Sequence, residues 1–463
     1  MEKLSDKEKY FDGSTSLTIN LFELIESEDS QSLNDLRAPQ SLERPERNRR
    51  IDVAVIGGGP SGMMASGKAG ELGAKVLLVE KNKTPGKKLL LTGKGRCNFT
   101  QAEFNERLFV ESFGKGGKFL LSALFNFGVK DVISFFEKHK LKTKIERGKR
   151  VFPITDRAED VLNVLIRYLK ENKVQVMNEA RVIDLEKEGN RIKKIITSRG
   201  DIFAKNFIIC TGGKSYPLTG STGDGYDFAQ KLGHKTITPE PALVPIEIKE
   251  KWVKDLQGLS LKNVQINVFQ NGKKQDDRFG EMIFTHFGLS GPIILDISKK
   301  VGELLKQGEV IISLDLKPAL EYPILDQRIR KDFKKYNNKI FKNSLKELLP
   351  QKLIPQIIEL SGINPEKTVN AITKEERKKL VGLLKNLKMQ VSGLMGFDQA
   401  IVTTGGVDLK EIDPRNMKSK LIDNLFFAGE IINLQGPTGG YNLQLCWSTG
   451  CLAGESAARL AGF

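Results

Sequence analysis

The sequence predicts a doubly wound α/β fold, and three features in a fixed order carry that prediction. An apolar, β-rich run over residues 51–56 ends in the turn Gly57-Gly58-Gly59-Pro60-Ser61-Gly62. A helix-compatible stretch, residues 63–72, follows, and a second apolar run, residues 75–79, ends at Glu80. Strand, glycine turn, helix, strand and acid together form one βαβ unit, the unit that opens a doubly wound sheet.

The turn matches the dinucleotide-binding pattern Gly57-x-Gly59-x-x-Gly62. The first glycine permits the tight turn, the second leaves room for a pyrophosphate at the backbone, and the third lets the helix pack closely on the strand. The following helix begins around Pro60 and Ser61, and its free N–H groups suit phosphates. Glu80, 18 residues after Gly62, is placed to accept hydrogen bonds from the adenosine ribose.

Length and composition limit the class of protein. The chain has 463 residues, 39% hydrophobic and 28% charged, which excludes a mostly disordered chain and predicts two or three domains. No segment reaches about 18 consecutive apolar residues, so no membrane span is expected. The four cysteines include no CxxC pair, and no histidine cluster accompanies them. We therefore expect no metal site, no disulfide framework and a cytoplasmic location.

The charge is distributed unevenly along the chain. There are 73 Lys and Arg against 57 Asp and Glu, a net charge of +16. Residues 1–50 hold eight basic and eleven acidic residues, a charge of −3, which leaves +19 on residues 51–463. Such an excess implies attraction to a polyanion and carries no information about the fold.

Five regions are expected along the chain. Residues 1–50 form a flexible N-terminal extension, and residues 51–242 form the first part of the cofactor domain. An inserted β-rich domain (243–321), a basic helical subdomain (322–395) and the second part of the cofactor domain (396–463) follow. A short amphipathic helix is compatible with residues 17–25 of the extension.

Hydrophobic patterning predicts further elements in both domains. Helices are expected at residues 160–170 and 446–460, with a mainly helical, basic pattern over 322–388. Strands are expected at residues 174–177, 181–184, 193–197, 206–210, 264–269, 281–284, 310–314 and 424–428.

Two further glycine-rich turns favour FAD over a nicotinamide cofactor. A strand ending in Gly429-Glu430 is followed by Gly436-Pro437-Thr438-Gly439-Gly440-Tyr441-Asn442 and a helix. Another strand ends in Cys210-Thr211-Gly212-Gly213. A ligand with two ends, such as FAD, can contact several glycine-rich turns that are far apart in the sequence. Glu430 is expected to accept hydrogen bonds from the ribityl hydroxyls of FAD. No second GxGxxG occurs, so NAD(P)H, if it is the reductant, is expected to reach the flavin directly.

Long motifs give the chain a resemblance to a known family. They are residues 57–62, 86–98, 211–217, 284–292 and 436–442. Together they resemble the HI0933-like family of bacterial FAD-dependent flavoproteins from about residue 51 to the end. The resemblance implies a Rossmann-type, glutathione-reductase-like FAD-binding domain, split by an inserted β-barrel-like domain that carries a helical subdomain. It also implies cofactor contacts by Lys81, Lys88, Thr92, Gly93, Gly95, Arg96, Asn98, Val182, Gly440, Tyr441 and Asn442. Lys94 stands where many relatives have glycine.

The substrate stays open between three classes. Members of the family are linked to amine oxidation, to steroid-type reduction, and to reduction of a ribosomal RNA uridine to dihydrouridine. Two basic clusters favour RNA: residues 138–150, and a stretch of the helical region. In the latter we expect RNA contacts from Arg328, Arg330, Lys331, Lys334, Lys335, Lys339 and Lys342, with Phe333, Tyr336 and Phe341 between them as base-stacking candidates. The alternatives are a flavin oxidase or reductase of a small amine, ketone or enone, and an RNA-binding flavoprotein without turnover.

Reduction of a uracil ring requires a proton donor beside the flavin. Cys97 is the first candidate, because it lies in a basic glycine loop that the family pattern places near the flavin, and because Arg96 could assist a thiolate. His286, in the turn Thr285-His286-Phe287-Gly288, is the second candidate. Cys210, Cys446 and Cys451 are expected to be core residues.

Overall fold

The computed structural model of the chain describes residues 51–463, so the expected extension and the helix at residues 17–25 lie outside the described residues. The described chain forms two compact units. The FAD unit consists of residues 51–242 and Gly396–Phe463, and the barrel unit consists of Leu243–Met395. Each unit has its own hydrophobic core.

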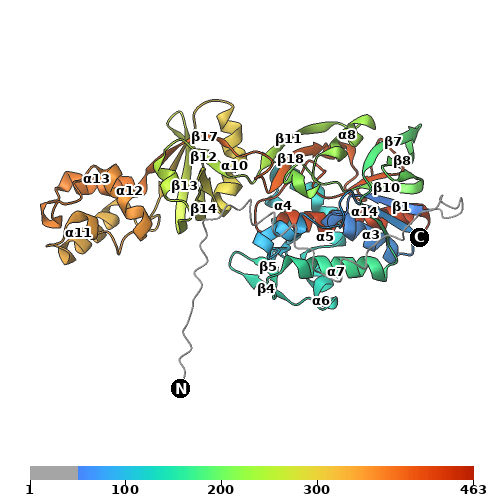
Figure 1. Cartoon of the computed structure of the whole chain (residues 1–463), viewed down its shortest axis with the longest axis horizontal. Coiled ribbons are helices and arrows are strands. Elements are labelled where there is room, and N and C mark those ends of the chain that lie inside the picture. Colours follow the sequence, from blue (N-terminus) through green and yellow to red (C-terminus); the bar gives the residue numbers. More distant parts are fainter. Residues whose placement is uncertain (1–50) are drawn as a thin grey trace, which may run out of the picture. The chain divides into compact units, whose positions relative to one another are not determined.

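The FAD unit is built on a five-stranded parallel sheet in the order β19-β10-β1-β2-β6, of which β1 and β10 are labelled in Figure 1. Its strands are β1 (Ile51–Ile56), β2 (Val76–Val79), β6 (Gln175–Met177), β10 (Ala204–Ile209) and β19 (Leu425–Phe427). β1 is fully buried except at its first residue and pairs with both β2 and β10. β-branched and aliphatic side chains suit a strand covered on both faces. The predicted doubly wound sheet is confirmed.

Two helices pack against each other beside this sheet: α3 (Pro60–Glu71) and α14 (Tyr441–Ala461). Their backbones approach closely because α14 has glycines at the contact: a Cβ on Gly450 would lie 2.5 Å from the Ser61 carbonyl oxygen. α7 (Ala158–Glu171) packs on the other side of α3. The closing helix therefore starts at Tyr441, earlier than the expected residue 446.

Smaller elements surround the sheet. Antiparallel strands β3 (Thr100–Gln101), β5 (Arg150–Pro153) and β4 (Thr143–Glu146) form one sheet, and β7 (Val182–Glu188), β8 (Arg191–Thr197) and β9 (Gly200–Ile202) form another. β11 (Thr236–Ala242) pairs with β18 (Val402–Val407). The helices here are α4 (Glu106–Glu111), α5 (Leu121–Asn126), α6 (Val129–Lys138) and α8 (Asp224–Lys231), and the 3-10 segments are η1 (Leu89–Gly95), η2 (Gly114–Leu120), η3 (Pro217–Thr219) and η7 (Leu409–Glu411).

The barrel unit contains a closed six-stranded barrel, which confirms the inserted barrel that the family resemblance implied. The strand order is β12-β15-β14-β13-β16-β17. The bounds are β12 (Ile246–Ile248), β13 (Ser260–Gln270), β14 (Lys273–Phe284), β15 (Gly288–Ser290), β16 (Ile311–Asp315) and β17 (Leu387–Leu394). The short helix α9 (Trp252–Asp255) lies between β12 and β13, and α10 (Pro292–Leu305) packs against β14.

The chain between β16 and β17 is helical. It contains α11 (Tyr322–Lys335), α12 (Ile354–Ser361) and α13 (Lys374–Lys385), with short 3-10 segments η4 (Phe341–Asn343), η5 (Gln351–Leu353) and η6 (Val369–Ala371). Their apolar side chains join the core of the barrel unit, including Phe333 and Phe341. The threonine hydroxyl of Thr373 caps α13 and completes a capping box with Glu376.

His234 follows α8 and is 3% exposed. Its Nε2 lies 2.7 Å from the Ser419 hydroxyl, and burial lowers its pKa below the ordinary 6.5. The unfolded chain therefore binds a proton that the folded chain does not, and stability falls as the pH drops below about 6.5. We expect His234→Gln to remove this part of the acid sensitivity. Urea unfolding at several pH values, followed by the fluorescence of Trp447 in a Trp252→Phe background, measures it; equal acid sensitivity in both proteins would contradict the assignment.

No single helix of residues 51–463 is long and apolar enough to cross a membrane. The segments Gly114–Asn126 and Val129–Lys138 meet that criterion together, by length and composition, with a bend of 41° between them.

Candidate functional site

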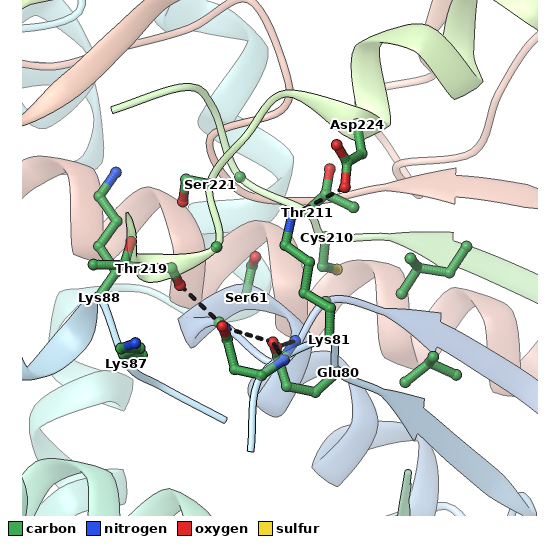
Figure 2. Close-up of a pocket in the computed structure, with 18 of the residues that line it drawn as sticks. Ser61, Glu80, Lys81, Lys87, Lys88, Cys210, Thr211, Thr219, Ser221 and Asp224 are labelled. Atoms are coloured by element: carbon green, nitrogen blue, oxygen red, sulfur yellow. Dashed lines mark hydrogen bonds and ion pairs between the residues drawn. The ribbon is translucent and has the colours of Figure 1, made fainter. Parts of the chain in front are cut away.

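A pocket opens where the carboxyl ends of β1, β2 and β10 meet (Figure 2). The pocket is open to solvent, and the empty space within it, including that solvent, is about 850 Å³. The glycine turn after β1, Glu80 after β2 and Cys210 after β10 line it. After β1 the next strand of this sheet is β2, on one side, and after β10 the next is β19, on the other side. The pocket between β1 and β10 therefore lies at the topological switch point of the doubly wound sheet.

The three glycines of the turn have different structural roles. Gly57 has φ +102°, and a Cβ there would lie 2.6 Å from the Cys210 carbonyl oxygen. A Cβ on Gly62 would overlap the Gly57 carbonyl oxygen. A Cβ on Gly59 meets no atom within 4 Å. Gly57 and Gly62 are thus required by the fold, whereas Gly59 leaves open space at the N-terminus of α3, where Pro60 and Ser61 also line the pocket.

Glu80 is 6% exposed and holds the glycine turn in place. Its Oε2 accepts from the Gly58 N–H at 2.7 Å, and its Oε1 accepts from the N–H and the side-chain amide of Asn82 at 2.8 and 2.7 Å. Burial raises the pKa of this carboxyl above its ordinary value, against the effect of these hydrogen bonds. The Asn82 amide also donates to the Thr219 carbonyl, so Glu80 and Asn82 join β2 to the η3 segment.

Lys81 spans the pocket from β2 to the start of α8. Its ammonium donates to the Thr222 hydroxyl at 2.5 Å and to the Asp224 carboxylate at 2.9 Å. Lys81 and Asp224 both line the pocket, as does the buried Val182 at the start of β7. The pair of Lys81 and Asp224 therefore joins the end of β2 to the start of α8 within the pocket.

Lys88 and Glu430 form a second polar cluster in the pocket. The Lys88 ammonium donates to the Glu430 carboxylate at 2.9 Å and to the Ser215 hydroxyl at 2.7 Å. Glu430 also accepts from Ser215 at 3.0 Å and from the Thr403 N–H at 2.7 Å. Four segments that are far apart in sequence therefore meet at one carboxylate, and the expected ribityl acceptor already binds three protein groups.

The segment after β10 contributes one buried polar atom without a partner. Thr211 lines the pocket, and its Oγ1 has no hydrogen-bond partner among the described residues. Gly212 lines the pocket as well, while Gly213 lies against Thr403. Cys210 and Cys446 also line the pocket, and burial raises the pKa of the Cys446 thiol to about 12.

The loop from Thr92 to Asn98 does not line this pocket. It turns through left-handed backbone at Gly93, Lys94 and Gly95, with φ of +58°, +57° and +82°. Lys94 thus adopts a conformation that glycine favours. Asn98 Oδ1 is buried without a partner among the described residues.

The structure does not support Cys97 as the proton donor. Cys97 is 0% exposed, and burial raises the pKa of its thiol to about 12. Arg96 does not assist it, because the guanidinium binds Asp156 at 2.6 Å and Glu146 at 2.5 Å and lies 4.2 Å from the Phe152 ring centroid. Cys97 therefore packs in the core of the FAD unit.

The second glycine loop leads into α14. Gly440 has φ +102° and lies against the backbone of Thr100. Asn442 fastens the loop: its amide donates to the carbonyls of Gly436 and Pro437 at 3.0 and 3.1 Å and accepts from the Gly436 N–H at 2.8 Å. Tyr441 packs on Phe109, with ring centroids 4.9 Å apart. Gly429 donates its N–H to the Thr449 hydroxyl.

Comparison with known proteins decides the family. The model of the HI0933-like protein Rossmann domain matches residues 51–456. The chain belongs to the HI0933-like family. A 3-dehydro-bile acid delta(4,6)-reductase from Clostridium scindens is 32% identical over 88% of this chain and 99% of that protein. A ribosomal RNA dihydrouridine synthase from Escherichia coli is 30% identical over 86% of this chain and 96% of that protein.

A solved structure shows the same fold. The 3-ketosteroid delta1-dehydrogenase from Sterolibacterium denitrificans has a TM-score of 0.50 and 14% identity over 88% of this chain and 99% of that chain. By its family and the curated relatives above, this HI0933-like protein is an FAD-dependent oxidoreductase with a Rossmann-type FAD-binding domain.

The pocket fits FAD. Open space at Gly59 lies beside the free N–H groups of α3, which suit a pyrophosphate. The buried Thr211 hydroxyl has no partner within residues 51–463 and is available to a polar group of a ligand. Within residues 51–463, no group of three or more His, Cys, Asp or Glu side chains could hold a metal ion.

The remaining predicted residues belong to the barrel unit. His286 is exposed in the turn between β14 and β15. On and after α11, several predicted RNA contacts already form ion pairs: Arg328 with Asp332, Arg330 with Asp326, Lys335 with Glu347, and Lys342 with Glu366. Lys331 and Lys334 are exposed without such partners in the described chain, and Lys339 lies 4.5 Å from the Tyr336 ring centroid.

The prediction that Phe333 and Phe341 stack bases is wrong. Phe333 is 9% exposed and Phe341 is 0% exposed, because both rings fill the core between the helices. Tyr336 is half-buried, and its hydroxyl donates to Glu347 at 2.5 Å. Base stacking in this region is therefore not supported by the phenylalanines.

Several residues of the site escaped the sequence analysis. Asn82, Thr219, Ser221 and Asp224 line the pocket, while Ser215 and Thr403 donate hydrogen bonds to the lining residue Glu430. No local motif marks the four lining residues. The Thr-Gly-Gly-Lys-Ser-Tyr-Pro motif was the one signal that could have identified Ser215.

Replacement of Cys97 by alanine tests its role. Because the thiol is buried away from the pocket, we expect Cys97→Ala to bind FAD and to change substrate-dependent flavin reoxidation by less than about tenfold, whereas loss of a general acid costs about 100-fold or more. Stopped-flow absorbance of the reduced flavin measures this rate. A loss of about 100-fold would restore Cys97 as the donor.

Proposed function

We propose that this oxidoreductase reduces a uridine of large-subunit ribosomal RNA to dihydrouridine. The observation that carries the proposal is the net charge of +19 on residues 51–463, together with Lys331, Lys334 and Lys346, which are exposed and free of ion pairs within the described chain. Exposed cations of this kind bind RNA phosphates, whereas a small neutral substrate has no negative charge for them to bind. The Escherichia coli relative, 30% identical, is named a ribosomal RNA dihydrouridine synthase.

FAD, when bound and reduced, supplies the hydride that adds to C6 of the uracil ring. The protein's part is to hold the cofactor through the turn Gly57–Gly62, Glu80 and the Lys88–Glu430 cluster, and to present the base. A base can lie over a flavin only outside its stack, so the substrate is a flipped or single-stranded uridine. NAD(P)H is the proposed reductant, reaching the flavin without a nucleotide-binding domain of its own.

His286 is the proposed acid that protonates C5, since it is the exposed member of the two predicted donors. His286→Gln is expected to keep FAD and its reduction by NAD(P)H, and to slow RNA-dependent reoxidation about 100-fold. Stopped-flow absorbance separates the two half-reactions, and His139→Gln, which changes a histidine of the FAD unit, is the control. Reoxidation at the wild-type rate would exclude His286.

The direct experiment incubates the FAD-loaded protein with NADPH or NADH and large-subunit ribosomal RNA from a strain that lacks its gene. Mass spectrometry of the nucleosides is expected to find new dihydrouridine. Lys331→Gln/Lys334→Gln is expected to lower the yield, while Lys273→Gln, an exposed lysine of the same unit, is not. No dihydrouridine in vitro, together with unchanged ribosomal RNA in the gene-deletion strain, would end the proposal.

A flavin reductase of a small enone is the second candidate, because the Clostridium scindens relative, 32% identical, is named a bile acid reductase. Rapid reoxidation of the reduced flavin by an enone, an amine-derived imine or a ketone without RNA would favour it. An RNA-binding flavoprotein without turnover is the third, and it predicts that FAD-free variants keep their cellular function.

A further inference from the structure

The hairpin of β4 and β5 carries a basic tip on the FAD unit. Arg147, Gly148 and Lys149 form the turn between the strands and are exposed, and Arg150 follows. Lys149 is 59% exposed in its side chain, and its ion pair with Glu103 at 2.7 Å lies at the surface. Lys140 and Lys142, before β4, are exposed, and their ammonium groups form no ion pair within residues 51–463. Figure 1 shows the hairpin next to α6 and α7.

This tip is fastened to β3 and the residue that follows it, and β3 in turn contacts α14. The Gln101 amide donates to the Gly148 carbonyl at 2.9 Å, and the Ala102 N–H donates to the Lys149 carbonyl at 2.7 Å. The neighbouring Thr100 donates its hydroxyl to Gln444 of α14 at 2.5 Å. The basic tip is therefore one strand away from the Gly439–Gly440 turn, within one compact unit.

An exposed aromatic ring lies next to the same tip. Phe104 is 44% exposed, and the Lys130 ammonium lies 5.8 Å from its ring centroid. Its neighbour Glu103 is the ion-pair partner of Lys149, so ring and tip are joined through adjacent residues. Cations that follow a backbone and an accessible ring on which a base can stack are the two parts of a single-strand binding surface.

We propose that this hairpin surface, consisting of Phe104, Lys140, Lys142, Arg147, Lys149 and Arg150, binds the single-stranded RNA that flanks the reacting uridine. The cations contact phosphates, and Phe104 stacks one base. This inference rests on the proposed function, and it assigns base stacking to the FAD unit in place of the buried Phe333 and Phe341.

Salt-dependent binding tests the cations. The FAD-loaded protein is titrated into a fluorescein-labelled single strand of about twelve uridines, and affinity is measured by anisotropy at several salt concentrations. Arg147→Gln/Lys149→Gln/Arg150→Gln is expected to make the slope of log K against log salt shallower by about two, near 0.7 for each lost phosphate contact. The matched control, Lys187→Gln/Arg191→Gln/Lys193→Gln, changes the exposed β7–β8 hairpin of the same unit and is expected to keep the slope.

Replacement of the ring tests the stacking. Phe104→Ala is expected to weaken binding about tenfold at every salt concentration with an unchanged slope, whereas Phe203→Ala, at a ring that is 57% exposed, is expected to have no effect. Equal flavin content shows that each variant is folded.

The outcomes separate the two proposals. A wild-type slope in the hairpin triple variant, or equal affinity for Phe104→Ala and Phe203→Ala, overturns the hairpin surface while wild-type protein still forms dihydrouridine. Wild-type protein that neither binds the strand nor forms dihydrouridine overturns the proposed function itself.

Discussion

Gly59→Val is expected to yield folded protein without FAD. A Cβ at Gly59 meets no protein atom within 4 Å and projects into the space beside the free N–H groups of α3. The fold therefore accepts the new side chain, while the cofactor pyrophosphate loses its place. Overpacking of this kind costs about 3 kcal/mol, so the affinity for FAD should fall at least about 100-fold. Flavin absorbance of the purified protein and FAD titration of the cofactor-free protein measure the effect.

Two controls make this result specific. Gly396→Val changes a glycine of the same unit that also has nothing within 4 Å of its Cβ, but lies outside the pocket lining, and it should keep FAD. Gly62→Ala should instead unfold the unit, since its Cβ overlaps the Gly57 carbonyl. Yellow, fully loaded Gly59→Val protein would contradict the assignment of this turn to the pyrophosphate.

Glu430→Leu is expected to lower the free energy of unfolding of the FAD unit by about 2–3 kcal/mol. The change leaves the Lys88 ammonium, the Ser215 hydroxyl and the Thr403 N–H without their shared acceptor, and Lys88 and Glu430 are only 21% and 17% exposed. Loss of one partner from a poorly solvated pair costs more than loss of both. Lys88→Met/Glu430→Leu should therefore be more stable than Glu430→Leu alone. Urea unfolding followed by Trp447 fluorescence, in the Trp252→Phe background, measures both.

Glu455→Leu is the matched control. The Glu455 side chain is 18% exposed, but its partner Arg459 is 69% exposed and returns to water when the pair is lost. A surface pair of this kind contributes less than about 1 kcal/mol. Equal losses in Glu430→Leu and Glu455→Leu would show that the Glu430 cluster adds no stability of its own.

The sequence predicted the FAD-binding fold well because the decisive signals are local. Residues 51–80 contain a complete βαβ unit, and each step of it follows from hydrophobic pattern and glycine geometry. The start of α14 was misplaced because Tyr441 and Asn442 follow two glycines and look like loop residues. Their hydrogen bonds and ring contacts, which make them the first helical turn, involve Gly436 and Phe109 and leave no local mark.

The candidate site was predictable only in part. The turns that line the pocket carry glycines, and glycines are visible in a sequence. The polar cluster at Glu430 unites residues 88, 215, 403 and 430, and nothing in any one segment reveals the other three. The charge and aromatic patterns also give no information about burial. Cys97, Phe333 and Phe341 were expected to be accessible to substrate, but their side chains are buried in the hydrophobic cores.

The division of the FAD unit into two stretches sets an order of events during synthesis. β10 is complete at Ile209, but its outer partner β19 begins only at Leu425, and α14 follows it. At roughly 5–20 residues per second, the ribosome leaves that sheet edge unpaired for roughly 10–40 seconds, while the whole barrel unit emerges and can fold. An unpaired apolar strand edge invites association with other chains. The nascent chain is therefore most exposed to aggregation, and most dependent on chaperones, in the interval before β19 and α14 leave the ribosome.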